Sequence, residues 1–229
     1  MPLDTQILGR GVYTPREAAR LVGTNAQQVL RWTRGSGPNE PLWNAHFQFL
    51  DDDVTEISFL DLIEVRIVAA MRRAGISLQS IRFAMDYAKS AFSLERPLAS
   101  QSFKTDGTEI LMEAMEDDGD FVSLSRNRAG QKVFGEIVFQ SLNDLEYEDE
   151  YAARWRPRKF PDVVIDPSRF FGEPILDDFG VSTKTLHDEY AAFGDAKYLS
   201  KIYEIPISKI NVGLRFEKKL DESYGQRPS

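Results

Sequence analysis

The stretch TPREAARLVGTNAQQVLRWTR, residues 14–34, carries the signals that decide the fold of the N-terminal part of the chain. Thr14 and Glu17 have the spacing of a capping box, and Pro15 stands at the first helical position, where a missing N–H costs least. Gly23 can end this first helix because glycine accepts a left-handed conformation. Two short helices joined by such a glycine-containing turn form a helix-turn-helix.

The second helix of this pair is expected to present polar side chains to solvent. Thr24 or Asn25 can cap its N-terminus, and Val29 is one of its apolar positions. Glutamine and arginine side chains can read base edges in the major groove of DNA. We therefore predict a DNA-binding face, made of Arg16, Thr24, Asn25, Gln27, Gln28, Arg31 and Arg34. A helical hairpin that carries a few arginines without meeting DNA is the alternative.

Composition and charge limit the classes of protein that fit the chain. Its 229 residues, 42% of them hydrophobic, suffice for one large or two small domains. The absence of cysteine excludes disulfides, thiolate metal sites and cysteine nucleophiles. No apolar run is long enough to span a bilayer and no signal-peptide core is present, so a cytoplasmic location is expected.

The charges are unevenly distributed along the chain. The net charge of −8 argues against coating nucleic acid with the whole surface. Residues 1–35 nevertheless hold five arginines against two acids, whereas residues 106–120 hold seven acids and no base. A basic end followed by an acidic middle predicts two different partners.

A short β-hairpin, or wing, is predicted over residues 42–57, before two longer helices. Ser58 is expected to open the first of these helices, which has an apolar stripe, and Ser77 to cap the second. The candidate inward positions of the wing are Leu42, Phe47, Phe49 and Leu50.

The order helix-turn-helix, wing and long helix is followed by an Arg-x-x-Gly-x-Ser-Leu-x-x-Ile element that starts at Arg72. Over roughly residues 12–90 this order resembles the N-terminal domain of the MerR family of winged helix-turn-helix regulators. The resemblance implies that the wing touches backbone phosphates and that four side chains face DNA, namely Arg16, Gln27, Gln28 and Arg31. The wing departs from the family because it has no arginine or lysine between Gly35 and Arg66.

The middle of the chain is predicted to be β-rich and acidic. β-branched and aromatic residues alternate between turn signals in four segments, residues 101–103, 108–112, 121–125 and 132–137. The acidic connection over residues 113–120 is read as a solvated loop, with an electrostatic face for a basic partner as the alternative. Five acids in residues 144–150 precede a basic cluster, and this charge reversal is typical of a linker. We expect Trp155 to be buried at a domain contact.

From Val163 onward the chain resembles the small C-terminal domain, originally named only as a domain of unknown function, of VapB-type antitoxins. The matching elements are Val163-Val164, Asp166-Pro167, Gly172-Glu173-Pro174-Ile175, and Thr183 before Leu186 and Tyr190. The family's Gly-Thr-Arg is replaced here by Asp177-Asp178-Phe179-Gly180. A three-helix, helix-turn-helix-like unit is predicted, with Thr183 as the cap of its first helix.

Together the two resemblances imply an antitoxin of a type II toxin–antitoxin pair. Such a protein binds operator DNA to repress its own operon and neutralises a PIN-type ribonuclease toxin. The predicted toxin contacts are Lys218, Lys219 and Arg227, because basic side chains compete with a metal for a carboxylate cluster. A homodimer is expected because operators are usually read as two half-sites. A ligand-responsive MerR-like regulator, with residues 100–160 as effector domain, and a pure protein-interaction module are the alternatives.

No enzymatic site is predicted. His46 and His187 lie far apart in ordinary contexts, and no glycine-rich phosphate loop, nucleophile elbow or metal-binding pair is present. We therefore expect no catalytic residue, metal or cofactor. The predicted fold class is α+β, divided into residues 1–92 (winged helix-turn-helix), 93–160 (β-rich acidic middle and linker), 161–220 (C-terminal helical domain) and 221–229 (flexible tail).

Overall fold

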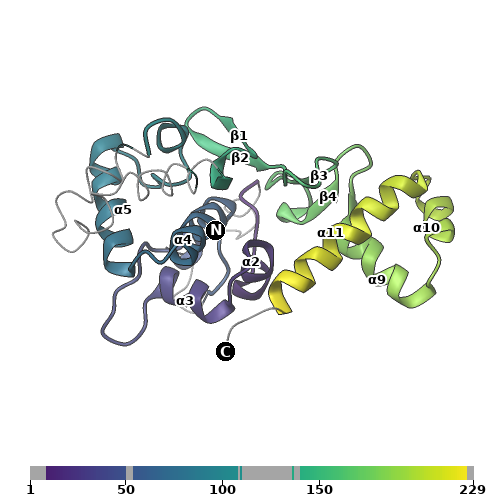
Figure 1. Cartoon of the computed structure of the whole chain (residues 1–229), viewed down its shortest axis with the longest axis horizontal. Helices are drawn as coiled ribbons and strands as arrows, with labels where there is room; N and C mark the ends of the chain where they lie inside the picture. Colours follow the sequence, from purple (N-terminus) through teal and green to yellow (C-terminus); the bar gives the residue numbers. More distant parts are fainter. Residues whose placement is uncertain (1–8, 50–53, 108, 110–135, 137–139, 226–229) are drawn as a thin grey trace.

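The computed structural model describes residues 9–49, 54–107, 109, 136 and 140–225. Its fold is α+β, as predicted. A small five-stranded antiparallel sheet lies between the N-terminal helices and the C-terminal helices (Figure 1). None of the helices in the described ranges is both long enough and apolar enough to cross a membrane.

The helix signals of the N-terminal part are confirmed. Helix α2 has a full capping box, in which the Thr14 hydroxyl accepts from the Glu17 N–H and the Glu17 carboxylate accepts from the Thr14 N–H. Gly23 ends α2 with φ +70°, and Asn25 rather than Thr24 caps the next helix. Among the described residues, this part contains α2 (Pro15–Val22), α3 (Ala26–Arg34), α4 (Phe59–Arg73) and α5 (Leu78–Phe92).

The predicted wing is wrong in the part of it that the structure describes. The chain between α3 and α4 forms a short 3₁₀ helix, η1 (His46–Phe49), and no β-hairpin is found among the described residues there. The strand-like contacts described for this segment are two isolated antiparallel bridges, one between Tyr13 and Ile57 and one between Ser36 and Asn39. Leu42 and Phe47 are buried as predicted, whereas residues 50–53 lie outside the described part.

The buried carboxylate of Asp61 explains why this segment is a compact loop. Trp43 Nε1 and the His46 backbone N–H both donate to it at 2.9 Å, and the Ser58 N–H donates at 3.0 Å. Leu42 and Trp43 are both buried although they are consecutive, so burial does not alternate as it does in a strand.

The five-stranded sheet is built from residues 145–182, which follow the segments for which strands were predicted. All neighbouring strands pair antiparallel in chain order, as β1 (Leu145–Glu148), β2 (Tyr151–Trp155), β3 (Val163–Ile165), β4 (Pro174–Leu176) and β5 (Val181–Ser182). Residues 101–107, predicted to start with a strand, are helical instead. The other three predicted strands, over 108–112, 121–125 and 132–137, lie almost wholly outside the described residues.

The predicted linker is the β1–β2 hairpin. Its charge reversal places acids on β1 opposite arginines on β2, with Glu146 paired to Arg154 in the register. Opposite charges across two strands stabilise a sheet, which is why this polar segment is ordered. Trp155 is buried at a contact with α4, as expected: the Arg66 guanidinium lies 4.3 Å from its ring centroid, and Asp144 accepts from its indole N–H at 3.0 Å.

The C-terminal part is helical, as predicted, with differences at both ends. Ser182, one residue before the predicted cap, caps α9 (Thr183–Phe193), and α10 (Ala196–Tyr203) and α11 (Ile207–Gly225) follow. The tail predicted from residue 221 is wrong as far as Gly225, because α11 continues through it and Leu220 is buried. Residues 226–229 lie outside the described part.

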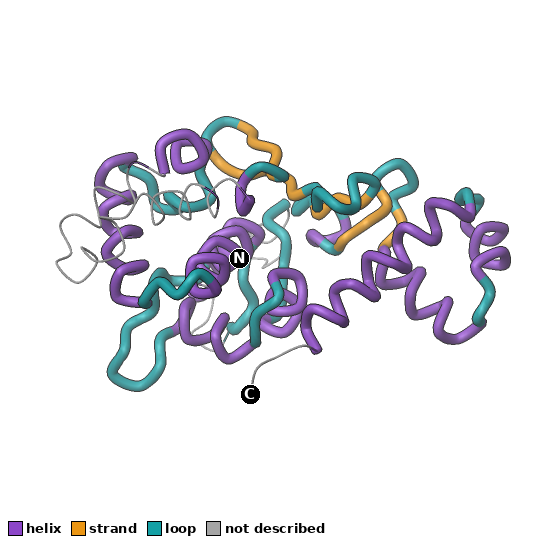
Figure 2. Tube along the Cα trace, viewed as in Figure 1, coloured by secondary structure: helices purple, strands orange, loops and turns teal. Residues whose placement is uncertain are grey.

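Two apolar cores hold these elements in place. One lies among α2–α5 and extends to β2 and β3 through Trp155 and Ile165. The other lies among β3, β4 and α9–α11, and includes Val163 and Phe216. Leu21 of α2 packs against both cores. Figure 2 shows the strands in the middle of the molecule and α11 running back toward the N-terminal helices.

Candidate nucleic-acid interface

Helices α2 and α3 present part of the predicted DNA-binding face to solvent. Their apolar faces are buried through residues such as Ala19 and Trp32, which fixes the angle between the two helices. The opposite side carries the exposed side chains of Arg16, Gln27 and Arg31. The structure therefore makes these three predicted residues accessible to a large polyanion.

The other predicted residues of this face take part in contacts within the protein. Asn25 Oδ1 accepts the Gln28 N–H at 2.8 Å, which is its role as N-cap of α3. The Thr24 hydroxyl donates to the Gln28 side-chain carbonyl, so these two side chains hold one another. Arg34 donates to the backbone carbonyl of Val54. These four side chains stabilise the turn before α3 and the end of α3. The exposed side chains of Arg16, Gln27 and Arg31, in contrast, can contact a ligand.

Further arginines near this face are partly occupied by backbone carbonyls. Arg73 donates to the Val22 carbonyl at 3.1 Å and thereby ties the end of α4 to the end of α2. Arg82 of α5 donates to the carbonyls of Pro41 and Glu40 at 2.6 and 2.7 Å. Arg31 and Arg82 line a common groove of about 540 Å³ between α3 and α5. Arg82 lies within the matching MerR-like range, but its position beside α3 had no signal in the sequence.

A buried pair of carboxylates supports the loop beneath α3. Arg96 Nη1 lies 2.7 Å from Asp61 Oδ1 and 3.3 Å from Glu64 Oε2. Both carboxylates are fully buried, and the other oxygen of Glu64 has no hydrogen-bond partner within the described structure. Burial raises the pKa of Glu64 to about 7, although the Arg96 charge opposes that shift. His46, at the edge of this cluster, has a pKa lowered by burial, which fits a structural histidine.

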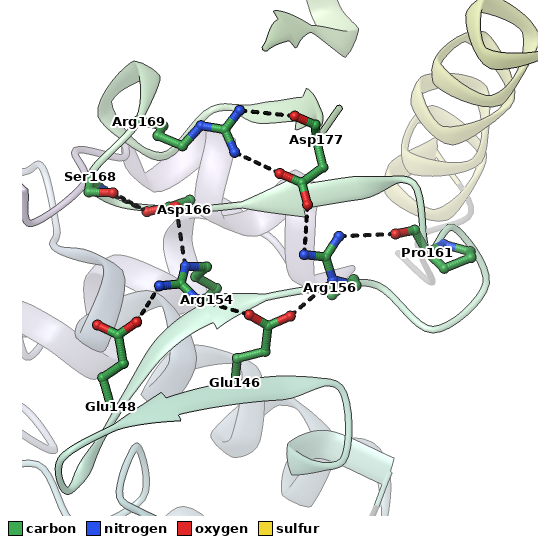
Figure 3. A network of polar contacts seen from close by, with 9 residues as sticks. All are labelled: Glu146, Glu148, Arg154, Arg156, Pro161, Asp166, Ser168, Arg169 and Asp177. Atoms are coloured by element: carbon green, nitrogen blue, oxygen red, sulfur yellow. Dashed lines mark hydrogen bonds and ion pairs between the residues drawn. The ribbon is translucent and has the colours of Figure 1, made fainter. Parts of the chain in front are cut away.

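The basic residues of the middle segment form an ion-pair network instead of a phosphate site (Figure 3). Arg154 lies 3.1 Å from Glu146 and 3.3 Å from Asp166, and it also pairs with Glu148. Arg156 bridges Glu146 at 3.0 Å and Asp177 at 2.8 Å. The hydrogen bond from Arg156 holds the pKa of Glu146 below its ordinary value, so the network is ionised at neutral pH.

Arg169 extends this network to the loop before β4. It lies 2.6 Å from Asp177, whose pKa is lowered by its hydrogen bonds from Arg156 and Arg169 even though burial acts in the opposite direction. Glu146 and Glu148 are two residues apart in the sequence, and so are Arg154 and Arg156. This matched spacing is the signal that could have predicted the network. These arginines pair with neighbouring acids.

The predicted toxin-binding lysines lie on the exposed side of α11. Lys218 lines a groove of about 620 Å³ together with Arg215, His187 and Tyr190. Lys219 is 53% exposed and lies 3.5 Å from Glu222. The third predicted contact, Arg227, is outside the described residues. The two lysines thus lie on α11, within the predicted C-terminal helical domain.

A mixed polar cavity bears on the ligand-responsive alternative. Its volume is about 780 Å³, and it lies between the loop before α4 and the sheet. Both basic and acidic side chains line it, among them Arg96, Arg154, Glu148 and Asp166. Such a lining does not resemble the predominantly apolar pockets that usually bind small effectors.

Comparison with known proteins links the chain to proteins of Mycobacterium tuberculosis. No known family model matches it. The chain is 36% identical over 135 residues to "Putative antitoxin VapB45" from strain H37Rv of that organism. This match covers 55% of the chain and 56% of VapB45, so the chain spans little more than half of this relative. The uncharacterized protein Rv2308 of the same strain is 24% identical over 226 residues, 94% of this chain and 93% of that protein.

The fold also has a counterpart among solved structures. The crystal structure of Rv2018 from Mycobacterium tuberculosis matches with a TM-score of 0.70 and 27% sequence identity. The match covers 88% of this chain and 96% of that chain. The arrangement of N-terminal helices, small sheet and C-terminal helices is therefore shared with a known structure. None of these relatives is described as a MerR protein, so the MerR-like assignment of the N-terminal helix-turn-helix stays a prediction.

Proposed function

We propose that this chain is the antitoxin of a toxin–antitoxin pair, which binds operator DNA and neutralises a ribonuclease toxin of the PIN type. The observation that carries the proposal is the 36% identity to VapB45. The exposed side chains of α2 and α3 support its DNA-binding half. In this proposal the protein is cytoplasmic, has no catalytic residue and needs no cofactor.

The proposed DNA contact places α3 in the major groove. Gln27 and Arg31 are one helical turn apart on its exposed face, so both can reach base edges. Arg16 lies in the first turn of α2, where it can meet a backbone phosphate. Because the chain carries a net charge of −8, binding depends on this local cluster, and we expect affinity to fall as salt rises.

The double variant Gln27→Ala with Arg31→Ala is expected to lose specific operator binding in an electrophoretic shift assay. Contacts of this kind contribute about 1–3 kcal/mol each, so the loss should amount to about 30-fold or more. Arg215→Ala, which removes an exposed arginine from α11, is the matched control and should bind as the wild type does. An unchanged shift for the double variant would refute the proposed reading helix.

The proposed toxin contact uses the lysines at the end of α11. Lys218 and Lys219 are exposed, and together with Arg227 they offer positive charge to a carboxylate-lined metal site. Deleting residues 217–229 is not a clean test of this contact, because it also removes Glu217 and Leu220, both of which are buried against the rest of the protein. The point variants Lys218→Ala and Lys219→Ala avoid that loss.

A homodimer completes the proposal. A single helix-turn-helix makes few base contacts, and two-fold symmetric proteins read two half-sites of an operator. The autorepression that we propose therefore requires two copies of the chain on one DNA duplex.

A further inference from the structure

The far end of the C-terminal helices exposes large apolar side chains to water. Phe193 at the end of α9 is 61% exposed, and Tyr198 and Ile202 of α10 are 43% and 56% exposed. The rings of Phe193 and Tyr198 lie 5.4 Å apart between centroids, so they form one surface. Tyr198 and Ile202 are one turn apart on α10 and extend this surface along the helix. We call these three residues the α10 face.

Packing inside the protein does not account for the α10 face. Helix α10 buries only Leu199, and the eleven-residue α9 buries only Thr183 and Leu186. Amphipathic helices of globular proteins normally turn their wide apolar stripe inward. A cluster of aromatic and aliphatic side chains left in water marks an interaction surface.

The exposed area suits one side of a protein–protein interface. From their exposed fractions, the three side chains leave on the order of 300 Å² of mostly apolar surface in water. One side of a standard interface contributes about 800 Å², of which somewhat more than half is apolar. The α10 face thus supplies a large part of the apolar core that one such interface needs.

The charges around the α10 face are complementary to a second copy of the same surface. Lys197 and Lys201 lie beside Tyr198 and Ile202 on the exposed side of α10, and the acids Asp195 and Glu204 stand at the two ends of that helix. The four charges sum to zero in a chain whose net charge of −8 makes two copies repel one another elsewhere. When two α10 helices run antiparallel, each lysine approaches an acidic end of the other helix.

We propose that a second copy of this chain docks on the α10 face, with the two α10 helices antiparallel about a two-fold axis. Such an axis makes the interface isologous, so that one patch meets itself. This proposal rests on the proposed function, because it specifies the interface of the homodimer proposed there. In Figure 1, α10 lies at the opposite end of the long axis from α3 and α5. The dimer is therefore elongated, with its two DNA-reading faces far from the two-fold axis.

The test is the mass of the full chain in solution, measured by sedimentation equilibrium at tens of micromolar. The wild type is expected at twice the chain mass of 26.1 kDa, and Ile202→Glu at the single mass. Phe170→Glu is the matched control, because it changes an equally exposed aromatic residue, 54% exposed, outside α9–α11. That variant should stay dimeric.

A charge exchange tests the antiparallel arrangement. Lys197→Glu should raise the dimer dissociation constant at least fivefold, and adding Glu204→Lys in the same chain should restore most of the affinity. A monomeric wild type overturns both this inference and the proposed homodimer. A dimer that survives Ile202→Glu overturns the α10 interface alone. Operator binding by the Ile202→Glu monomer, reduced but specific, would show that DNA recognition by α3 stands independently of the interface.

Discussion

Replacing Arg20 with alanine is expected to lower the free energy of unfolding by about 3 kcal/mol, because it leaves a buried charge without its partner. Arg20 Nη1 lies 2.7 Å from Glu217 Oε2, and the Glu217 side chain is only 1% exposed. The Thr183 hydroxyl also donates to Glu217, but a neutral donor cannot replace the guanidinium charge. Urea denaturation followed by circular dichroism measures the change.

Two variants distinguish the effect of the unpaired Glu217 carboxylate on stability from the effect of lost side-chain packing. Arg16→Ala removes an exposed arginine from the same helix and should change stability by less than about 0.5 kcal/mol. Adding Glu217→Gln to Arg20→Ala removes the uncompensated charge, so it should recover about half of the loss or more. If Arg20→Ala costs no more than Arg16→Ala, the contact does not join α2 to α11 in solution.

This contact matters for function because it links the two proposed activities. Arg20 belongs to α2, the first helix of the pair that we propose to bind DNA, and it also lies 2.8 Å from Asp221 near the end of α11. The toxin contacts that we propose, Lys218 and Lys219, are on that same stretch of α11. A partner that bends or shifts the end of α11 would therefore act directly on α2.

Glu64→Gln is expected to make the protein more stable than the wild type above pH 7, by up to about 3 kcal/mol. Burial raises the pKa of Glu64 in the folded protein from 4.5 to about 7. Between these two values the unfolded chain releases the Glu64 proton while the folded chain keeps it. The stabilising contribution of the neutral acid is thus complete below pH 4.5 and is lost as pH rises through 7. Glutamine cannot ionise, so the variant should lack this decline.

Urea denaturation at pH 5 and at pH 8 gives the comparison. The wild type and Glu64→Gln should differ by less than about 1 kcal/mol at pH 5, and the variant should be the more stable at pH 8. Glu40→Gln, at an exposed position outside the α10 face, controls for the general loss of one negative charge. A Glu64→Gln variant that is less stable at pH 8 would mean that the ion pair with Arg96 outweighs the cost of burying the carboxylate.

The parts of the fold that short-range chemistry determines could be predicted from the sequence. The Thr14–Glu17 capping box and the left-handed Gly23 are contacts within one turn, and the structure has both. The hairpin over 145–155 was missed because its stability comes from ion pairs across strands, which look like a linker when the charges are read in sequence order. The wing was mispredicted because its loop folds onto Asp61, a buried carboxylate fifteen or more residues away.

The candidate site was predictable only in part, for a similar reason. The exposed positions of Gln27 and Arg31 follow from the helical period of α3. The helical period does not predict individual side-chain contacts. The hydrogen bonds from Thr24 to Gln28 and from Arg34 to the Val54 carbonyl are contacts of this kind. The extension of α11 to Gly225 depends on its contact with α2, 197 residues away in the sequence.

Neutralisation of a ribonuclease by this chain, as we propose it, is measured by the cleavage of RNA in vitro. The full chain is purified from its native host with its bound partner, and the partner is then freed by denaturation and refolding. We expect a small nuclease whose cleavage of RNA needs a divalent metal and stops when wild-type chain is added back. The double variant Lys218→Ala with Lys219→Ala should still bind operator DNA as the wild type does. It should, however, inhibit RNA cleavage at least tenfold less than the wild type. If no ribonuclease activity accompanies the chain, or if cleavage continues when an excess of the chain is added, the chain does not neutralise a ribonuclease.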